Sequence, residues 1–150
     1  MIIGMSEECK SPIREVGPGR IYQEPRVGRR YVAGTDVALG VGMDYSVTVI
    51  LDVNSGYVVA DLVTNTLQPE DFSVASMILL EEFSKPDWAI ENNFSDTVLT
   101  IARNENYPRL YRRTVGRGKT ARREIGWKTD RMSRQNLFDE LRLTFNDGHL

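Results

Sequence analysis

The sequence predicts an α/β domain with a mixed sheet, in which a three-strand antiparallel meander is followed by strands that alternate with helices. Residues 45–53 alternate between two kinds of side chain, the period of two that is typical of a strand. Asn54-Ser55-Gly56 then supplies a short hairpin loop before the next strand. From Pro69 onward the apolar residues recur every three or four positions, which indicates a helix. Since a strand reached through a helix lies parallel to a neighbour, the sheet is expected to be mixed.

Length and composition narrow the class of protein. At 150 residues, with 41% apolar and 27% charged residues, the chain suits one domain with one hydrophobic core. It has no apolar run of about 18 residues and no secretory signal, so no membrane partner is expected. Cys9 is the only cysteine, which excludes an intramolecular disulfide and a zinc cluster of thiolates. A reducing, cytoplasmic setting fits these features.

The elements are expected in the following order. Proline and glycine recur every few residues through residues 1–29, so we expect a linker or N-terminal arm there and the domain proper over residues 30–150. Within the domain the sequence predicts strands at 30–36, 45–53, 57–64, 88–91 and 110–113, and helices that begin at Pro69, near Phe94 and at Asp130. The glycine-rich, basic segment 115–124 indicates an exposed loop.

Side-chain periodicity assigns faces to some of these elements. The strand at 45–53 has one face with Val47, Val49, Leu51 and Val53 and another with Ser46, Thr48 and Asp52. The first helix has an apolar face of Phe72, Ala75, Ile78, Leu79 and Phe83 and ends before Lys85-Pro86. The last helix, over residues 130–145, is expected to turn inward Leu137, Phe138, Leu141 and Phe145.

Two acids stand where ligands gather in sheets of this kind. Asp36 and Glu91 each follow an apolar strand, and ligands bind beyond the carboxyl ends of parallel strands. On neighbouring strands the two carboxylates would repel each other unless a cation lay between them, and Mg²⁺ and Mn²⁺ prefer such oxygen ligands. A pair of such ions, about 4 Å apart, can activate water for phosphodiester cleavage. Asp44 is a further candidate ligand. The alternatives are a turn-capping role for Asp36 or Asp44 and an ion pair with arginine for Glu91.

The net charge of -2 conceals a basic block. Residues 109–134 contain ten Lys/Arg against two acids, whereas the rest of the chain contains nine Lys/Arg against 19 acids. Such a block can hold phosphate groups without base selectivity, or it can be a solvated loop. The candidate DNA-binding residues are Arg112, Arg113, Arg117, Lys119, Arg122, Arg123 and Lys128.

Four motifs in the same order and spacing resemble one family. Gly34-Thr35-Asp36 with Gly40-Val41-Gly42-Met43-Asp44 resembles the first-strand motif of the nuclease domain of tailed-phage terminase large subunits, and Glu91-Asn92-Asn93 resembles its second acidic motif. A tyrosine-arginine strand, 107–113, followed by Gly126-Trp127-Lys128-Thr129 is similar to its later signature. The likeness spans residues 31–148.

The resemblance implies an RNase H-like fold and a metal-dependent endonuclease that cuts concatemeric double-stranded DNA during genome packaging in the cytoplasm of the infected bacterial host. Asp36 and Glu91 would be the first two members of its acidic metal-binding set. Expected partners are DNA, an ATPase motor domain, the small terminase subunit and the portal. The family's third acid lies on a C-terminal segment, and the late acids here, Asp139, Glu140 and Asp147, have no matching context. The chain therefore resembles a nuclease domain that lacks its C-terminal piece.

A nucleotide is not expected as a cofactor. Gly118-Lys119-Thr120 resembles the end of a phosphate-binding loop, but Arg113 occupies the position of that motif's first glycine. Two other functions stay open. One is a non-catalytic DNA-binding or docking module of the packaging motor, and the other is a different RNase H-like nuclease, of the resolvase or transposase type.

Overall fold

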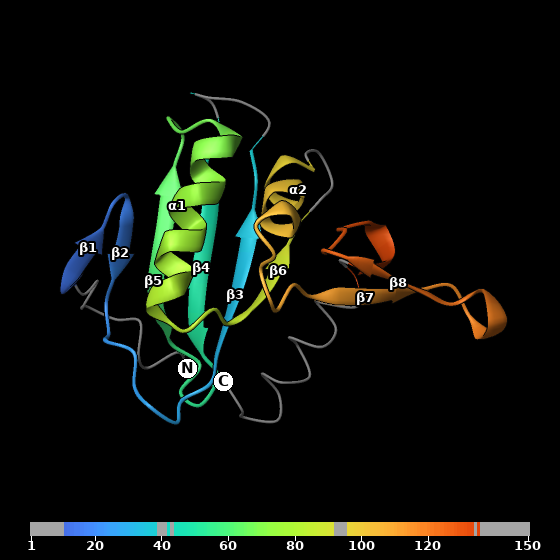
Figure 1. The fold of residues 1–150 in the computed structure, drawn as a ribbon, viewed down its shortest axis with the longest axis horizontal. Helices are drawn as coiled ribbons and strands as arrows, with labels where there is room; N and C mark the ends of the chain where they lie inside the picture. The colour runs from blue at the N-terminus through green and yellow to red at the C-terminus, as the bar shows by residue number, and fades with distance from the viewer. Residues whose placement is uncertain (1–10, 39–41, 43, 92–95, 134, 136–150) are drawn as a thin grey trace.

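A computed structural model of the chain describes residues 11–38, 42, 44–91, 96–133 and 135. Its main feature is a six-stranded sheet in the order β1-β2-β5-β4-β3-β6, with two helices on one face (Figure 1). The strands are β1 (Arg14–Val16), β2 (Gly19–Ile21), β3 (Tyr31–Asp36), β4 (Ser46–Asp52), β5 (Val58–Thr64) and β6 (Asp87–Ile90). The helices are α1 (Pro69–Glu82) and α2 (Thr97–Asn104).

The pairing of the central strands confirms the predicted mixed sheet. β3 pairs antiparallel with β4, and β4 pairs antiparallel with β5, which makes the three-strand meander. The chain then crosses through α1 and returns as β6, which pairs parallel with β3. The crossover explains the parallel pairing, because a helix carries the chain back to the end of the sheet where β3 begins.

The expectation that residues 1–29 form an arm outside the domain is wrong for its described part. β2 pairs antiparallel with β5, so β1 and β2 extend the sheet, and Ile21 is fully buried in the core. A Cβ atom on Gly19 would lie 3.0 Å from Leu79 Cδ1, so this glycine lets β2 approach α1. Each of the two strands is only three residues long. Strands that short, separated by a turn at Gly17, show no period in the sequence.

The helices and the sheet enclose the core between them. α1 buries Phe72, Leu79 and Leu80, and α2 buries Val98, Leu99 and Ala102. Ile78 is 52% exposed, although the sequence placed it on the apolar face of α1, and Ser73 and Ser76 are buried instead. Both hydroxyls have hydrogen-bond partners, since Ser73 Oγ donates to the Pro69 carbonyl at 2.7 Å and Ser76 Oγ lies 2.9 Å from Thr48 Oγ1. Hydrogen bonding makes their burial tolerable.

The second sheet is a β-hairpin of β7 (Arg112–Val115) and β8 (Arg122–Ile125), which projects from the side of the main sheet (Figure 1). It corrects the prediction of an exposed loop over residues 115–124. A short 3₁₀ turn, η1 (Gly118–Thr120), lies between the strands. The charged strand sequences lack apolar alternation, because the hairpin buries little of either face.

The predicted helix over 130–145 lies largely outside the described residues. Its start is visible, since residues 131–133 are helical. Asp130 Oδ1 accepts the Ser133 N–H at 2.8 Å, and Ser133 Oγ accepts the Asp130 N–H at 2.9 Å. This reciprocal pair caps the helix, which begins at the position that the sequence predicts. The part of the chain that the structure describes contains no helix long and apolar enough to cross a membrane.

Candidate active site

The carboxyl ends of β3 and β6 bring Asp36 and Glu91 together. The parallel register runs from Val32 opposite Asp87 to Thr35 opposite Ile90, so the next residues along the two strands are Asp36 and Glu91. The Glu91 N–H donates to the Thr35 carbonyl at 2.9 Å, which extends the pairing to the end of β6. The two side chains are close enough to share a hydrogen bond. The juxtaposition that the sequence predicted is present.

Both carboxylates lie on the sheet face opposite the helices. Thr35 and Ile90, the preceding residues, are buried beneath α1 and α2, and side chains alternate between faces along a strand. Asp36 is exposed and Glu91 is half-buried. The pair is therefore open to a ligand from solvent while its backbone is held by the sheet.

The environment of Asp36 favours its protonated form. Loss of hydration, a hydrogen bond shared with Glu91 and repulsion by the Glu91 charge, in that order, raise the pKa of Asp36 to about 6. The Val37 N–H, a hydrogen-bond donor to the carboxylate, opposes the shift. Two carboxylates held this close repel each other when both are ionised. A cation placed between them would remove the repulsion.

A buried chain of hydrogen bonds lies directly beneath the pair. Trp88 Nε1 donates to Thr35 Oγ1 at 2.8 Å, and Thr35 Oγ1 lies 2.7 Å from Thr48 Oγ1. Thr48 Oγ1 is also the partner of Ser76 Oγ on α1. All four residues are at most 5% exposed. These hydrogen bonds join β6, β3, β4 and α1 one residue before Asp36. They therefore fix the register that aligns the two acids.

The sequence did not reveal this chain of hydroxyls. On β4 the face with Ser46, Thr48 and Asp52 is the one that packs under the helices, whereas Val47, Val49 and Leu51 are half-exposed. The polar face of a strand ordinarily faces water, so periodicity alone points the wrong way. The available signal was a threonine on each of two adjacent strands, but pairing them requires the register.

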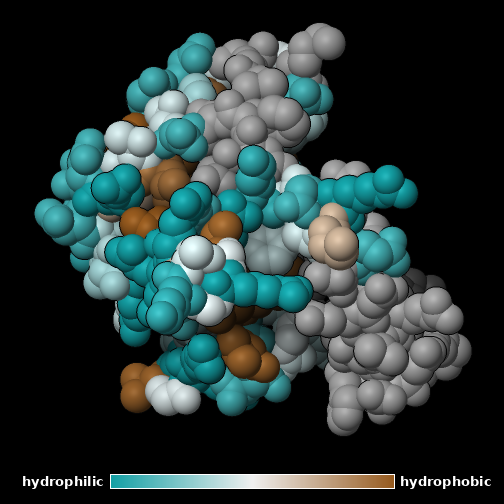
Figure 2. Space-filling model, turned by 90° about the vertical axis from the view of Figure 1, so that its right-hand side faces the viewer, coloured by the Kyte–Doolittle hydropathy of each residue, from teal (hydrophilic) through white to brown (hydrophobic). Residues whose placement is uncertain are grey.

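The other predicted site residues fall in two groups. Asp44 lies exposed before β4, and among the described residues no third Asp, Glu, His or Cys joins the acid pair. The basic residues lie on or next to the hairpin, with Arg112 and Arg113 on β7, Arg122 and Arg123 on β8, and the remaining three at Arg117, Lys119 and Lys128. The side of the molecule from which the hairpin projects is largely hydrophilic where its described residues are visible (Figure 2).

The base of the hairpin adjoins the acid pair. Trp127 forms a parallel bridge with Glu91, and its N–H donates to the Ile90 carbonyl at 2.7 Å. On the same edge of β6, the Tyr111 N–H donates to the Trp88 carbonyl at 2.8 Å. The chain thus leaves the sheet edge after Tyr111, forms the hairpin and returns beside Glu91. The basic hairpin is therefore attached along β6, the edge strand that leads to Glu91.

Neither a protein-family model nor a curated protein sequence matches the chain. Among solved structures, the large terminase nuclease from thermophilic phage G20c with bound magnesium is similar over 92% of this chain and 65% of its own, with a TM-score of 0.65 and 16% identity. The same nuclease with bound cobalt gives a TM-score of 0.65 and 15% identity over the same shares of the two chains. The large terminase nuclease domain of Thermus phage P74-26 is similar over 67% of this chain and 52% of its own, with a TM-score of 0.51 and 23% identity.

These likenesses concern the fold, because the sequence identities are low. The chain spans between 50% and 65% of the matched structures, and the fold class that its motifs implied is confirmed across the described strands and helices. This chain has the RNase H-like fold of the phage large terminase nucleases.

Proposed function

We propose that the chain is a divalent-metal-dependent DNA endonuclease domain, of the kind that cuts concatemeric DNA during phage genome packaging in the host cytoplasm. The observation that carries the proposal is the juxtaposition of Asp36 and Glu91 at the ends of two parallel strands. The fold shared with phage terminase nucleases, some of them with bound magnesium, cobalt or zinc, supports it.

The donor set fits a hard divalent ion. Asp36 and Glu91 offer adjacent carboxylate oxygens, and the repulsion by the Glu91 charge that helps to raise the pKa of Asp36 is one that a bound cation would relieve. Mg²⁺ and Mn²⁺ favour oxygen ligands and accept water and phosphate oxygens at their other positions, so two protein carboxylates are compatible with one or two ions. When bound, such ions supply charge neutralisation at the phosphate and activation of the attacking water.

The residues of the chain have separable tasks in this function. The two acids hold the ion, and the buried hydroxyls beneath them keep both strands in register. The basic hairpin binds the phosphate backbone of double-stranded DNA, and its attachment beside Glu91 brings that backbone to the acid pair. An ATPase motor, a small terminase subunit and a portal are the partners that this function implies.

Plasmid cleavage tests the proposal. The 150-residue chain is incubated with supercoiled plasmid and Mn²⁺, Mg²⁺ or Co²⁺, beside Asp36→Ala, Glu91→Ala and Asp44→Ala. We expect cleavage by the wild type and at least about a 100-fold loss in the first two variants, since metal assistance contributes several kcal/mol to the rate. Asp44→Ala, which removes an exposed acid outside the pair, retains activity. Cleavage that persists in both Asp36→Ala and Glu91→Ala would contradict the proposal.

A second candidate function is a DNA-binding module without cleavage. It is favoured by the presence of two carboxylates, without a third, in the part of the site that the structure describes. Plasmid binding that persists in chelator, with no cleavage in any of the three metals, would select it. Binding and cleavage are therefore measured on the same preparations.

A further inference from the structure

The two faces of the β7–β8 hairpin differ in charge. The register places Arg112 opposite Ile125, Arg113 opposite Glu124, Thr114 opposite Arg123 and Val115 opposite Arg122. Because residues directly opposite each other share a face and successive residues alternate, one face carries Arg112, Thr114, Arg123 and Ile125. The other face carries Arg113, Val115, Arg122 and Glu124.

On the face with Glu124, one carboxylate partly offsets the charge of two arginines. Glu124 pairs with Arg113 Nη2 at 3.1 Å and with Arg122 Nη2 at 2.8 Å. Hydrogen bonds first from Arg122 and then from Arg113 lower the pKa of Glu124, so the carboxylate is ionised at neutral pH. A phosphate that approached this face would compete with a carboxylate already bound to both arginines. Two of the seven predicted DNA contacts therefore have an internal anion.

The opposite face has arginines that pair with no carboxylate among the described residues. Arg112 and Arg123 are exposed, and neither forms an ion pair in the part of the chain that the structure describes. Two cations without a local anion make this the electropositive face of the hairpin. It is the better candidate for a polyanion.

This electropositive face opens onto a cavity of about 390 Å³ at the junction with α2. Arg112 and Ile125 line the cavity from the hairpin, and Arg103 lines it from the last turn of α2. The rest of the wall is made by Asn106, Tyr107, Pro108 and Leu110. The lining contains two arginines and an asparagine and no acidic residue. The two arginines come from separate elements and line one water-accessible space that no carboxylate of the described residues shares. Such a pair of guanidinium groups suits one phosphate group with its two free oxygens.

The cavity lies apart from the acid pair. α2 covers the helical face of the sheet, whereas Asp36 and Glu91 are on the other face, at the carboxyl ends of the strands. Tyr107, another wall residue, hydrogen-bonds through its hydroxyl to the Pro86 carbonyl, at the opposite end of β6 from Glu91. An anion held there would be a positioning contact away from the site of cleavage.

We propose that Arg103, with Arg112 and Arg123 of the hairpin, forms a phosphate-binding groove for the backbone of duplex DNA. The groove deepens the proposed DNA-cutting function and rests on it for the identity of the polyanion. It adds Arg103, which lies outside the basic block, to the DNA-binding surface. It also removes Arg122, which the block includes, from that surface.

The test compares neighbouring arginines on one strand. Binding of a fluorescent 30-base-pair duplex to the full chain is measured by anisotropy in EDTA, at several NaCl concentrations, for the wild type, Arg103→Ala, Arg123→Ala and Arg122→Ala. Each phosphate contact contributes about 0.9 to the slope of log K against log salt. We expect Arg103→Ala and Arg123→Ala to lower that slope by about 0.9 each and to weaken binding about threefold or more at 0.1–0.2 M salt. Arg122→Ala keeps the wild-type slope.

A charge-preserving variant separates contact from folding. Arg103→Lys is expected to restore most of the slope, whereas Arg103→Ala does not, and the melting temperatures of all variants serve as the control for structure. The inference is overturned if Arg103→Ala binds with the wild-type salt slope, or if Arg122→Ala loses as much as Arg123→Ala. Because the binding is measured in EDTA, a failure here is distinct from a failure of metal-dependent cleavage. If the wild type cleaves plasmid in none of the three metals while the salt slopes are as expected, the enzyme assignment is overturned and the groove stays in place.

Discussion

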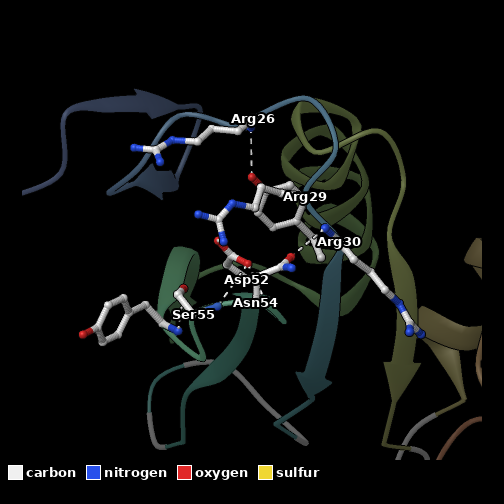
Figure 3. A network of polar contacts seen from close by, with 8 residues as sticks. Arg26, Arg29, Arg30, Asp52, Asn54 and Ser55 are labelled. Atoms are coloured by element: carbon white, nitrogen blue, oxygen red, sulfur yellow. Dashed lines mark hydrogen bonds and ion pairs between the residues drawn. The ribbon is translucent and has the colours of Figure 1, made fainter.

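Asp36 and Asp52 lie at opposite ends of the same pair of strands and are stabilised in contrasting ways. Asp36 ends β3, and Asp52 ends β4 opposite Tyr31, at the start of β3. Asp52 is 3% exposed, and its Oδ1 accepts the Asn54 N–H at 2.8 Å, while its Oδ2 lies 3.7 Å from Arg29 Nη1 (Figure 3). Asp36 instead faces a second acid.

The difference separates an acid that stabilises the fold from one that is available to a ligand. The turn amide and Arg29 satisfy Asp52 from within the chain, so it closes the β4–β5 hairpin. The environment of Asp36 is unfavourable to its charge, and acids with a pKa shifted in this way cluster at functional sites. Substitutions of Asp36, of Asp52 and of the residues that hydrogen-bond beneath the acid pair should therefore have different effects.

The largest expected effect is on metal binding. Asp36→Asn removes one of two adjacent ligands and is expected to weaken Mn²⁺ binding about 100-fold or more, whereas Asp52→Asn binds Mn²⁺ as the wild type does. Isothermal titration calorimetry on the folded variants provides both affinities. An equal loss of Mn²⁺ affinity in the two variants would show that Asp36 is no more a metal ligand than Asp52 is.

Stability is expected to show the reverse order. Asp52→Ala leaves two turn amides, of Asn54 and Ser55, without their acceptor and Arg29 without its partner, so the free energy of unfolding should fall by about 1–3 kcal/mol. Asp36→Asn relieves a repulsion and should leave the metal-free protein as stable as the wild type or more so at pH 7. Urea denaturation in EDTA measures both. A large destabilisation by Asp36→Asn would assign that acid a structural role.

The sequence predicts that Asp36 and Glu91 lie together, but it does not predict the role of Asp52 or every strand of the fold. The helical crossover from β5 to β6 made a parallel strand predictable, and a parallel register brings the strand-end acids Asp36 and Glu91 together. The same rule does not tell Asp36 from Asp52, because each follows an apolar strand and the partners of Asp52 come from the turn and from Arg29. The β1–β2 strands escaped prediction because three residues carry no period, and their place depends on β5. The sequence predicts a strand at 110–113, but its partner β8 escaped because a hairpin that buries little of either face shows no apolar alternation in its sequence.

The buried hydroxyls beneath the acid pair are expected to stabilise the fold without contacting a ligand. Thr48→Val keeps the shape of the side chain but removes the bridge between Thr35 and Ser76, so we expect a loss of about 1–3 kcal/mol in unfolding free energy. Thr100→Val, an exposed threonine on α2, is the matched control and should change stability by less than about 0.5 kcal/mol. Thermal denaturation of both variants measures the difference. A Thr48→Val protein as stable as the control would show that the hydrogen-bond chain contributes nothing to the strand register.

The smallest effect is the dependence of stability on pH. The pKa of Asp36 rises in the fold from its ordinary value of 3.8 to about 6, so the folded protein binds a proton more tightly than the unfolded chain. The resulting stabilisation is complete below pH 3.8 and is lost as the pH rises through about 6. Between pH 5 and pH 7.5 in EDTA, the wild type should lose stability relative to Asp36→Asn, and replacing the EDTA with Mn²⁺ should suppress that loss. Parallel pH profiles for the two proteins would contradict the shared-proton account.

A Mn²⁺-soaked crystal tests the central claim most directly, through anomalous diffraction at the manganese edge. The account predicts an anomalous peak in contact with carboxylate oxygens of both Asp36 and Glu91. No peak at these side chains, or a peak bound by one of them alone, would contradict it.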